Sequence, residues 1–412
     1  MLSVNQALEF LLTAAESTSQ VATRSEMVNT LDANQRILSA DQVSSLHVPP
    51  MDNTQMDGYA VRAAECVSGQ ALLPISQRIP AGHIAHTLQE GSAARIFTGA
   101  FIPDGADAVV MQEQTQVEEV NGLPHVRILH APKAGEWIRR QGEDIRAGAN
   151  ILKAGTRLRA QECGLAASVG LAQLPVVAPL RVAVFFTGDE LSMPGEALRP
   201  GAIYNSNRFV LTSLLQNLKC HITDYGIVPD SLQATRETLR KAAQEHDVII
   251  TSGGVSVGEE DHVRPAVEAE GEIAMWQIAM KPGKPLAFGK VRKPDAAADS
   301  AFFLGLPGNP VSSFVTFLLF VRPFLLRLQG VREVSPQAYQ VRADFEWLKA
   351  DKRNEFLRAR LNADGGLELF PNQSSGVLSS AVWGDGLVDV AVGSTIQRGD
   401  LVRFLPFSNL LY

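Results

Sequence analysis

A short strand that ends in a glycine-rich turn constrains this chain more than any other stretch. The segment His246–Asp261, HDVIITSGGVSVGEED, opens with the β-branched run Val248–Thr251. An uninterrupted apolar run of this length predicts a strand that is buried on both faces. Glycines after such a strand let the backbone turn tightly and present N–H groups to an anion. We therefore expect a ligand site at the carboxyl end of this strand, where open α/β sheets bind their ligands.

The turn itself is rich in small polar residues, and acids follow it. The candidate anion-binding residues are Ser252, Gly253, Gly254 and Ser256, and the acids are Glu259, Glu260 and Asp261. Acids at this point can hold a hard cation such as Mg²⁺ that bridges to phosphate oxygens. The turn matches neither G-x-G-x-x-G nor a Walker A motif, so a simple helix-capping turn remains an alternative.

The residues around this strand predict an α/β sheet. Candidate strands lie at 181–186, running into Thr187, and at 221–227, and candidate helices lie at 207–219 and 231–245. Alternation of strands and helices predicts a parallel sheet with right-handed crossovers. Three strand ends would then bring Glu190, Asp230 and the glycine turn to one edge of the sheet, which favours a binding site there.

Two motifs follow this region. In MKPGKP, Lys281 and Lys284 flank a Pro-Gly turn that fixes their relative position. Two ammonium groups beside acids suit an oxyanion next to a metal, although two solvated lysines are the common alternative. In LPGNP, Asn309 and Pro310 are expected to begin a helix that is apolar around much of its circumference, and so is buried. Because Arg322 and Pro323 interrupt the apolar tract Val311–Leu326, we expect it to be too short and broken to span a bilayer.

The remaining segments are assigned from their periodicity. Residues 1–45 look helical, with a capping box at Ser3 and Gln6 and a second helix around Thr30–Ala40, and helical periodicity returns at Ala160–Val169. Residues 46–146 and 331–412 carry short alternating runs between turns, which predicts a β-rich domain and a small β-sandwich or barrel.

The β-rich segment contains polar residues at turns and strand ends. These are Asp57 in a turn, Thr98 at a strand end, and Arg139, Arg140 and Asp144 in RRQGED. Arginine suits bidentate phosphate contacts and acids suit a metal, while a turn and a surface salt-bridge cluster are the ordinary alternatives.

Composition limits the classes of partner. The 412 residues carry a net charge of −7 with no basic block, so nucleic acid is an unlikely partner. Cys66, Cys163 and Cys220 form neither a zinc pattern nor pair spacing, which favours a reducing compartment. The N-terminus lacks the basic region of a signal peptide. We expect a soluble, cytoplasmic protein without a membrane partner.

Several motifs in order resemble the molybdopterin molybdenumtransferase family, the bacterial MoeA type that is related to the gephyrin E domain and the plant Cnx1 E domain. The matching segments are MDNTQMDGYAV (51–61), RIFTGAFIPDGADAVVMQE (95–113), RRQGEDI (139–145), FFTGDEL (185–191), SGGVSVGEED (252–261), AMKPGKPLAFGK (279–290), LGLPGNPVSSF (304–314) and EFLRARL (355–361). Together they cover nearly the whole chain.

The resemblance implies four domains: an extended helical domain (1–45 and 147–177), an inserted β-rich domain (46–146), a molybdopterin-binding-like α/β domain (178–330) and a C-terminal β-barrel domain (331–412). It also implies a homodimer with its active site between the α/β domain of one subunit and the β-rich domain of the other. The implied reaction inserts molybdate into adenylylated molybdopterin. Mg²⁺-assisted hydrolysis of the adenylyl bond releases AMP and molybdenum cofactor, and an adenylyltransferase is an expected partner.

By the same resemblance, the site residues fall into three groups. The expected catalytic residues are Asp57, Glu190, Asp230, Asp261, Lys281 and Lys284. The expected substrate-binding residues are Thr98, Arg139, Arg140, Asp144, Ser252, Gly253, Gly254, Ser256, Pro307 and Arg353. The expected metal ligands are Asp57, Glu190 and Asp261.

Two positions depart from the family pattern: Asn205 stands where an Asp is common, and 373–376 reads QSSG in place of a GSG motif. Other functions remain open. A molybdopterin adenylyltransferase shares the α/β fold but needs neither the β-rich insertion nor the C-terminal barrel. A receptor-anchoring scaffold should not need the full set of acids, and a phosphosugar- or nucleotide-binding protein is a weaker option.

Overall fold

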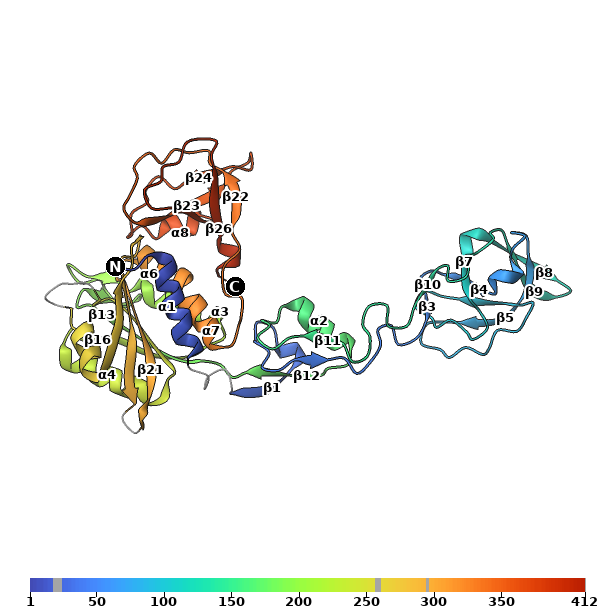
Figure 1. The fold of residues 1–412 in the computed structure, drawn as a ribbon, viewed down its shortest axis with the longest axis horizontal. Coiled ribbons are helices and arrows are strands. Elements are labelled where there is room, and N and C mark those ends of the chain that lie inside the picture. The colour runs from blue at the N-terminus through green and yellow to red at the C-terminus, as the bar shows by residue number, and fades with distance from the viewer. Residues whose placement is uncertain (18–23, 256–260, 294–295, 412) are drawn as a thin grey trace.

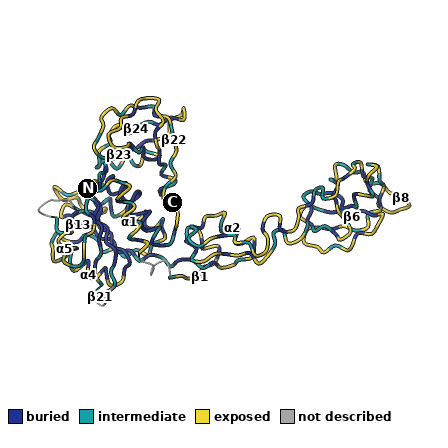
Figure 2. Tube along the Cα trace, in the orientation of Figure 1, coloured by how far each residue is buried: buried dark blue, intermediate teal, exposed yellow. Residues whose placement is uncertain are grey.

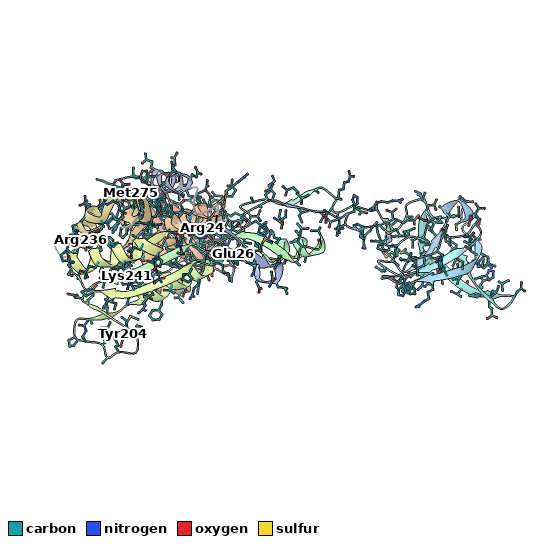
Figure 3. The ribbon with its side chains drawn as sticks, turned by 90° about the horizontal axis from the view of Figure 1, so that it is seen from below. Arg24, Glu26, Tyr204, Arg236, Lys241 and Met275 are labelled. Carbon is teal, nitrogen blue, oxygen red and sulfur yellow. The ribbon has the colours of Figure 1, made fainter. Side chains whose placement is uncertain are left out.

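The computed structural model describes residues 1–17, 24–255, 261–293 and 296–411. The molecule is elongated: an α/β region and a C-terminal sheet lie at one end, and a β-rich region lies at the other (Figure 1). A view turned by 90° shows the same separation (Figure 3). Thin connecting segments, which are mostly exposed or half-buried, join the two ends (Figure 2).

The α/β region contains a six-stranded sheet with the order β16-β13-β17-β21-β20-β18. Its strands are β13 (Arg181–Thr187), β16 (His221–Val228), β17 (Val248–Ser252), β18 (Gly271–Gln277), β20 (Pro285–Lys293) and β21 (Ala296–Leu306), and its helices are α3 (Ser206–Asn217), α4 (Leu232–Glu245) and α5 (Val263–Glu270). Strand β17 is buried along its whole length and pairs in parallel with β13 and β21. The predicted buried strand is confirmed.

The predicted parallel pairing is confirmed for the strands from which it was inferred, but the sheet as a whole is mixed, because β20 runs antiparallel to both β21 and β18. Strands β20 and β21 are close in sequence, and so short a connection makes a hairpin, whereas a parallel crossover needs a dozen residues or more. The four strands β16, β13, β17 and β21 are parallel, and their carboxyl ends share one edge.

The apolar run after Pro310 forms one continuous helix of α6 (Pro310–Thr316), the π-helical segment η4 (Phe317–Val321) and α7 (Arg322–Leu328). By length and composition it could cross a membrane, so the expectation that it is too short is wrong; 83% of its most apolar window is buried inside the protein. Helix α1 (Val4–Glu16), with its predicted Ser3–Gln6 capping box, packs against α7. The N-terminal helix therefore joins the core of the α/β region.

The segment that leads away from this core contains short strands and one helix: β1 (Ser25–Asn29), η1 (Thr30–Asp32), β2 (Gln42–Val43), β11 (Asn150–Leu152), α2 (Ala160–Ser168) and β12 (Gln173–Val177). Helix α2 confirms the helix predicted at Ala160–Val169. The predicted helix around Thr30–Ala40 is wrong: a single 3-10 turn forms there, and Leu31, which the helical pattern would bury, is 96% exposed.

The distal β-rich region is a six-stranded sheet with the order β7-β4-β6-β5-β9-β8 plus the pair β3–β10. Its elements are β3 (Asn53–Thr54), β4 (Gly58–Val61), η2 (Ala63–Glu65), β5 (Leu72–Ile79), β6 (Ala93–Ile96), β7 (Ala108–Met111), η3 (Gln112–Gln114), β8 (Thr115–Val120), β9 (Leu123–Ile128) and β10 (Ile138–Arg139). The predicted β-rich character of this segment is confirmed.

The C-terminal region is a sheet with the order β19-β23-β25-β26-β22, and β24 pairs with β23. Its elements are β22 (Tyr339–Arg342), β23 (Asn354–Leu361), β24 (Leu367–Leu369), α8 (Ser379–Trp383), β25 (Gly386–Val390), β26 (Leu401–Pro406) and η5 (Phe407–Asn409). Within the described residues the two end strands do not pair, so the sheet is an open half-barrel. Its edge strand β19 (Met280–Lys281) comes from the α/β region.

Candidate functional site

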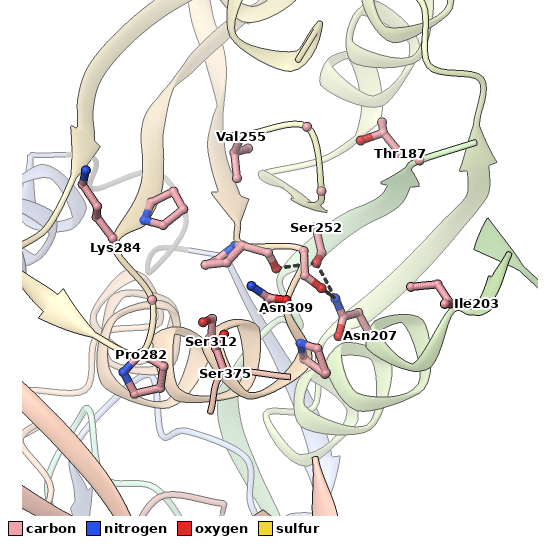
Figure 4. Close-up of a pocket in the computed structure, with 18 of the residues that line it drawn as sticks. Thr187, Ile203, Asn207, Ser252, Val255, Pro282, Lys284, Asn309, Ser312 and Ser375 are labelled. Carbon is pink, nitrogen blue, oxygen red and sulfur yellow. Dashed lines mark hydrogen bonds between the residues drawn. The ribbon is translucent and has the colours of Figure 1, made fainter. Parts of the chain in front are cut away.

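A cavity of ≈830 Å³ opens at the carboxyl edge of the parallel strands (Figure 4). Ten of the residues predicted from the sequence line it. They are Glu190, Asp230, Ser252, Gly253, Gly254, Asp261, Lys281, Lys284, Pro307 and Arg353. The short strands β14 (Leu191–Ser192) and β15 (Ile203–Tyr204) contribute further lining residues. The strand ends thus bring acids, cations and a glycine turn around one space.

The glycine turn is fixed by the packing beneath it. Gly253 has φ +100°, and a Cβ at this position would lie 2.4 Å from the carbonyl oxygen of Thr187. Only glycine fits such a position without strain. Ser252 Oγ donates to the Pro307 carbonyl at 2.9 Å and accepts from Asn207 Nδ2 at 2.8 Å (Figure 4). These bonds hold the turn against the neighbouring strand end.

Sequence reasoning missed Asn207. Its amide, on helix α3, also donates to the Gly308 carbonyl at 2.7 Å, so it links the glycine turn to the LPGNP loop. A lone asparagine in a helix gives no sequence signal, because its partners are 45 and 101 residues away. Gln373, Ser374 and Ser375 also line the cavity, so the altered C-terminal motif still reaches it.

Three buried polar atoms on the cavity wall have no hydrogen-bond partner within the described residues: Thr187 Oγ1, Asn205 Nδ2 and Asp230 Oδ1. Buried polar groups are normally paired, so such atoms indicate a ligand-binding surface. Burial raises the pKa of Asp230, and nearby Asp189, Asp261 and Glu190 raise it further against the opposing effect of His262. This wall therefore favours a polar or cationic ligand.

The cavity lining also carries three cations, Lys281, Lys284 and Arg353, of which Lys281 and Arg353 are paired with acids. Lys281 Nζ lies 2.7 Å from Glu355 Oε1, and Trp347 Nε1 donates to Glu355 Oε2 at 2.9 Å. The side chain of Glu355 is only 2% exposed. Arg353 donates to Asp351, and these bonds lower the pKa of Asp351 to about 2. Lys284 has no carboxylate within 4.0 Å among the residues placed by the structure, which leaves its charge available to a ligand.

The remaining predicted residues lie in the distal β-rich region. Asp57 Oδ1 accepts from the backbone N–H and from Oγ1 of Thr98, both at 2.7 Å. The side-chain bond from Thr98, followed by its backbone bond, lowers the pKa of Asp57. Arg139 pairs with Asn53 across β10 and β3, and Arg140 forms a 2.6 Å ion pair with Asp52. Asp144 follows this strand and is exposed.

One chain does not bring these two sets together, because β3, β4 and β10 lie at the far end of the molecule from β13 and β21 (Figure 1). Accordingly, the described residues contain no group of three or more His, Cys, Asp or Glu that could hold a metal ion. The ligand set predicted from Asp57, Glu190 and Asp261 is therefore not assembled within one chain. Ser256 lies outside the described residues.

Comparison with known proteins identifies the family. Family models match three segments: the MoeA N-terminal region (domain I and II) at 2–170, a probable molybdopterin binding domain at 183–327, and the MoeA C-terminal region (domain IV) at 340–407. A molybdopterin molybdenumtransferase from Haemophilus influenzae is 36% identical over 395 residues, covering 94% of this chain and 95% of the relative. The chain belongs to the MoeA family of molybdopterin molybdenumtransferases.

Other MoeA relatives agree. A molybdopterin molybdenumtransferase from a Nostoc species is 38% identical over 395 residues, covering 92% of this chain and 89% of the relative. A gephyrin from Dictyostelium discoideum is 32% identical over 364 residues, which span 80% of this chain and 50% of that protein. The crystal structure of a molybdopterin biosynthesis MoeA protein from Pyrococcus horikoshii superposes with a TM-score of 0.81 at 26% identity, covering 98% of this chain and 100% of that chain.

Proposed function

We propose that this protein inserts molybdate into adenylylated molybdopterin and hydrolyses the adenylyl bond, releasing AMP and molybdenum cofactor. The observation that carries the proposal is the cavity at the sheet edge, which is lined both by the acids Glu190, Asp230 and Asp261 and by the cations Lys281, Lys284 and Arg353. Cleavage of a phosphoric anhydride depends on positioning and on neutralisation of charge. A cavity lined by both acids and cations supplies both.

Each group of lining residues has a distinct part in this proposal. The Ser252–Gly254 turn lies against the diphosphate, since a glycine turn after a strand presents donors to anions. The Gly253 N–H already donates to the Leu306 carbonyl at 3.2 Å, so the N–H of Gly254 is the proposed donor. Lys281, Lys284 and Arg353 attract the dianionic molybdate, and Arg139 or Arg140 of a second copy adds charge from the opposite side. Pro307 shapes the floor, because its carbonyl holds the Ser252 hydroxyl.

The acids of the cavity fit Mg²⁺. Asp230 Oδ1 is buried and has no partner within the described residues, and the neighbouring acids help to raise its pKa. Mg²⁺ typically takes one or two carboxylates and completes its shell with substrate phosphates and water, so a preformed cluster of three acids is not required. When bound, the ion would neutralise the charge that develops on the diphosphate oxygens. Glu190 and Asp261, with Asp57 of a second copy, are the proposed ligands, and Asp230 lines the same cavity as a further acid for the ion or its water shell.

A homodimer completes the site in this proposal. Asp57, Thr98 and Asp144 lie too far along the same chain to reach the cavity, so they would enter the site of another subunit (Figure 1). The molybdopterin adenylyltransferase that supplies the substrate is the proposed protein partner, and the proposed location is the cytoplasm.

The test follows AMP release. Purified protein is incubated with adenylylated molybdopterin and Mg²⁺, with and without molybdate. We expect AMP only when molybdate is present, and we expect Asp57→Asn and Glu190→Ala each to abolish its release. AMP formation at the same rate without molybdate, or full activity of both variants, would contradict the proposal.

A further inference from the structure

Asp247 joins three segments of the chain at the point where the distal region is connected to the α/β region. Residues 24–177 form the distal sheet and the connecting segment, and we call them the arm. The Asp247 carboxylate, whose side chain is 7% exposed, accepts from Arg24 Nη2 at 2.6 Å and from Arg181 Nη2 at 2.9 Å. Arg24 directly precedes the first strand of the arm (Figure 3), and Arg181 begins the first strand after the arm. One carboxylate therefore binds both ends of the arm.

Backbone hydrogen bonds hold these three residues in register; we call Asp247, Arg24 and Arg181 the clamp. The N–H of Asp247 donates to the Arg181 carbonyl at 2.9 Å, and the N–H of Arg181 donates to the Asp247 carboxylate at 2.9 Å. The N–H of Ala178 donates to the Arg24 carbonyl at 2.9 Å. Burial raises the pKa of Asp247, but the bonds from Arg181 and Arg24 outweigh burial and lower this pKa. A buried, ionised carboxylate needs both guanidinium partners, because losing one leaves its charge poorly compensated.

The clamp lies at the opposite end of the parallel strands from the cavity. Asp247 directly precedes β17, and Ser252 ends this strand at the cavity. Five residues of strand span about 16 Å, so the Asp247 carboxylate is remote from any ligand in the cavity. A residue in this place can affect the reaction only through the position of another element.

Other contacts also hold the base of the arm, so loss of the clamp should tilt the arm without detaching it. Arg157 donates to the Asn217 carbonyl at 2.8 Å, and Val177 packs in the core of the α/β region. The distal face lies at the far end of the arm (Figure 1), so a small rotation at the base moves Asp57 by a much larger distance. Misplacement of a reacting group by about 1 Å can lower a rate by about a hundredfold.

We propose that Asp247 is a positioning residue: by holding Arg24 and Arg181 together, it sets the direction of the arm so that Asp57 enters the cavity of a second copy. This inference rests on the function proposed above, in which two copies of the chain share each site.

The first test measures molybdate-dependent AMP release by full-length variants. Arg24→Gln removes only the arm's half of the clamp and keeps the bonds between Asp247 and Arg181, and the Arg24 side chain is 35% exposed, so this variant should fold. We expect AMP release to fall by roughly tenfold or more. Asp247→Asn should lower it to a similar extent. The double variant should be no slower than the slower single one, because residues that act as a unit have non-additive effects.

Glu270→Gln is the matched control. The Glu270 side chain is 11% exposed and also binds two arginines, Arg236 and Arg240, but it joins two helices within the α/β region. This variant should release AMP as the unaltered protein does. An equal fall in AMP release for Glu270→Gln and Asp247→Asn would overturn the inference, because loss of any buried ion pair would then explain the effect.

The second test assigns the effect to one subunit of a mixed dimer. One subunit carries Asp57→Asn and supplies only a working cavity, and the other carries Glu190→Ala and supplies only a working distal face. Arg24→Gln added to the subunit that supplies the distal face should lower AMP release by roughly tenfold or more. The same change in the subunit that supplies the cavity should leave AMP release unchanged. Damage to the cavity through β17 would give the opposite result.

The inference is overturned if Arg24→Gln acts equally in both subunits or acts only in the subunit that supplies the cavity. Full AMP release by both Arg24→Gln and Asp247→Asn would also overturn it. Failure of the proposed function is recognised separately: the mixed dimer without Arg24→Gln would then release no AMP, which would remove the shared site and with it the role of the clamp.

Discussion

The two ends of the molecule carry similar chemical groups that differ in their burial. In the cavity, Ser252 is 3% exposed and Glu355 is 2% exposed, and both are fixed by hydrogen bonds from neighbouring elements. On the distal face, Thr98, Arg139, Arg140 and Asp144 are exposed. The cavity is shaped by the fold of one chain, whereas the distal face is a charged, exposed surface.

This difference suggests that the cavity and the distal face have different roles in the proposed reaction. Strand ends, a glycine turn and buried bonds give the cavity a fixed shape, which positions reacting groups. An exposed face can be carried to another subunit because no packing ties it to its own cavity. Predictions that treat the two ends differently therefore test the proposed mechanism directly.

The largest expected effect is complementation between two inactive proteins. Asp57→Asn removes a carboxylate from the distal face only, and Glu190→Ala removes a carboxylate from the cavity only. If each site combines one cavity with the face of a second copy, a 1:1 mixture of exchanged subunits restores about a quarter of the sites. AMP release by the mixture, compared with each variant alone, measures this. An inactive mixture, after subunit exchange has been verified, would place the whole site within one chain.

Next in size is the effect of filling the glycine turn. Gly253→Ala should lower the free energy of unfolding by roughly 2–4 kcal/mol, because it combines a left-handed φ with a contact 2.4 Å from a backbone oxygen. Gly82 is a matched control in the distal region: its φ is +81°, and a Cβ added there would have no atom within 4 Å. Gly82→Ala should cost about 1 kcal/mol from strain alone. Equal urea midpoints for the two variants would mean that the turn is not held as tightly as the structure indicates.

A smaller effect is expected beside the cations of the cavity. Glu355→Gln weakens the bond to Lys281 and should lower the free energy of unfolding by about 1–2 kcal/mol, because the carboxylate is buried and accepts two bonds. The control is Glu368→Gln, which breaks the exposed pair with Arg360 on the same sheet and should change stability by about 0.5 kcal/mol or less. Tryptophan fluorescence during urea unfolding compares them, and an equal loss in both would contradict the role of burial.

Sequence reasoning succeeded where local chemistry and tertiary packing agree. The run Val248–Thr251 could be recognised as a buried strand because β-branched residues are followed at once by glycines, and the acids after each parallel strand had to reach the same edge. Ten cavity residues were found in this way and from family motifs. The predicted domain boundaries and the individual roles of the acids stay predictions.

Prediction from the sequence failed where contacts between residues far apart in the chain determine the structure. The helix expected around Thr30–Ala40 does not form because this segment is held by bonds to the 156–177 stretch, such as Leu38 N–H to the Thr156 carbonyl at 3.0 Å. Asn207 was missed because its role exists only in three dimensions.

The smallest expected effect concerns the pKa of Asp57. Thr98 donates two bonds to the ionised carboxylate, and these lower the pKa of Asp57. Thr98→Val removes the hydroxyl bond and keeps the backbone one, so the pKa of Asp57 should rise part of the way towards its ordinary value. An ionised Asp57 is required in the proposed site, so protonation at a higher pH should move the acid limb of the AMP-release profile to higher pH. The free energy of unfolding depends on pH in the same direction. The stabilisation from the lowered pKa of Asp57 is fully present above the pKa of this group in the unfolded chain, and it is lost as the pH falls through its pKa in the folded protein.

Thr98→Ser keeps the hydroxyl and should retain the original acid limb. Identical acid limbs for the Val and Ser variants would show that this hydroxyl does not tune the carboxylate, and that the distal face is ordered by its backbone alone.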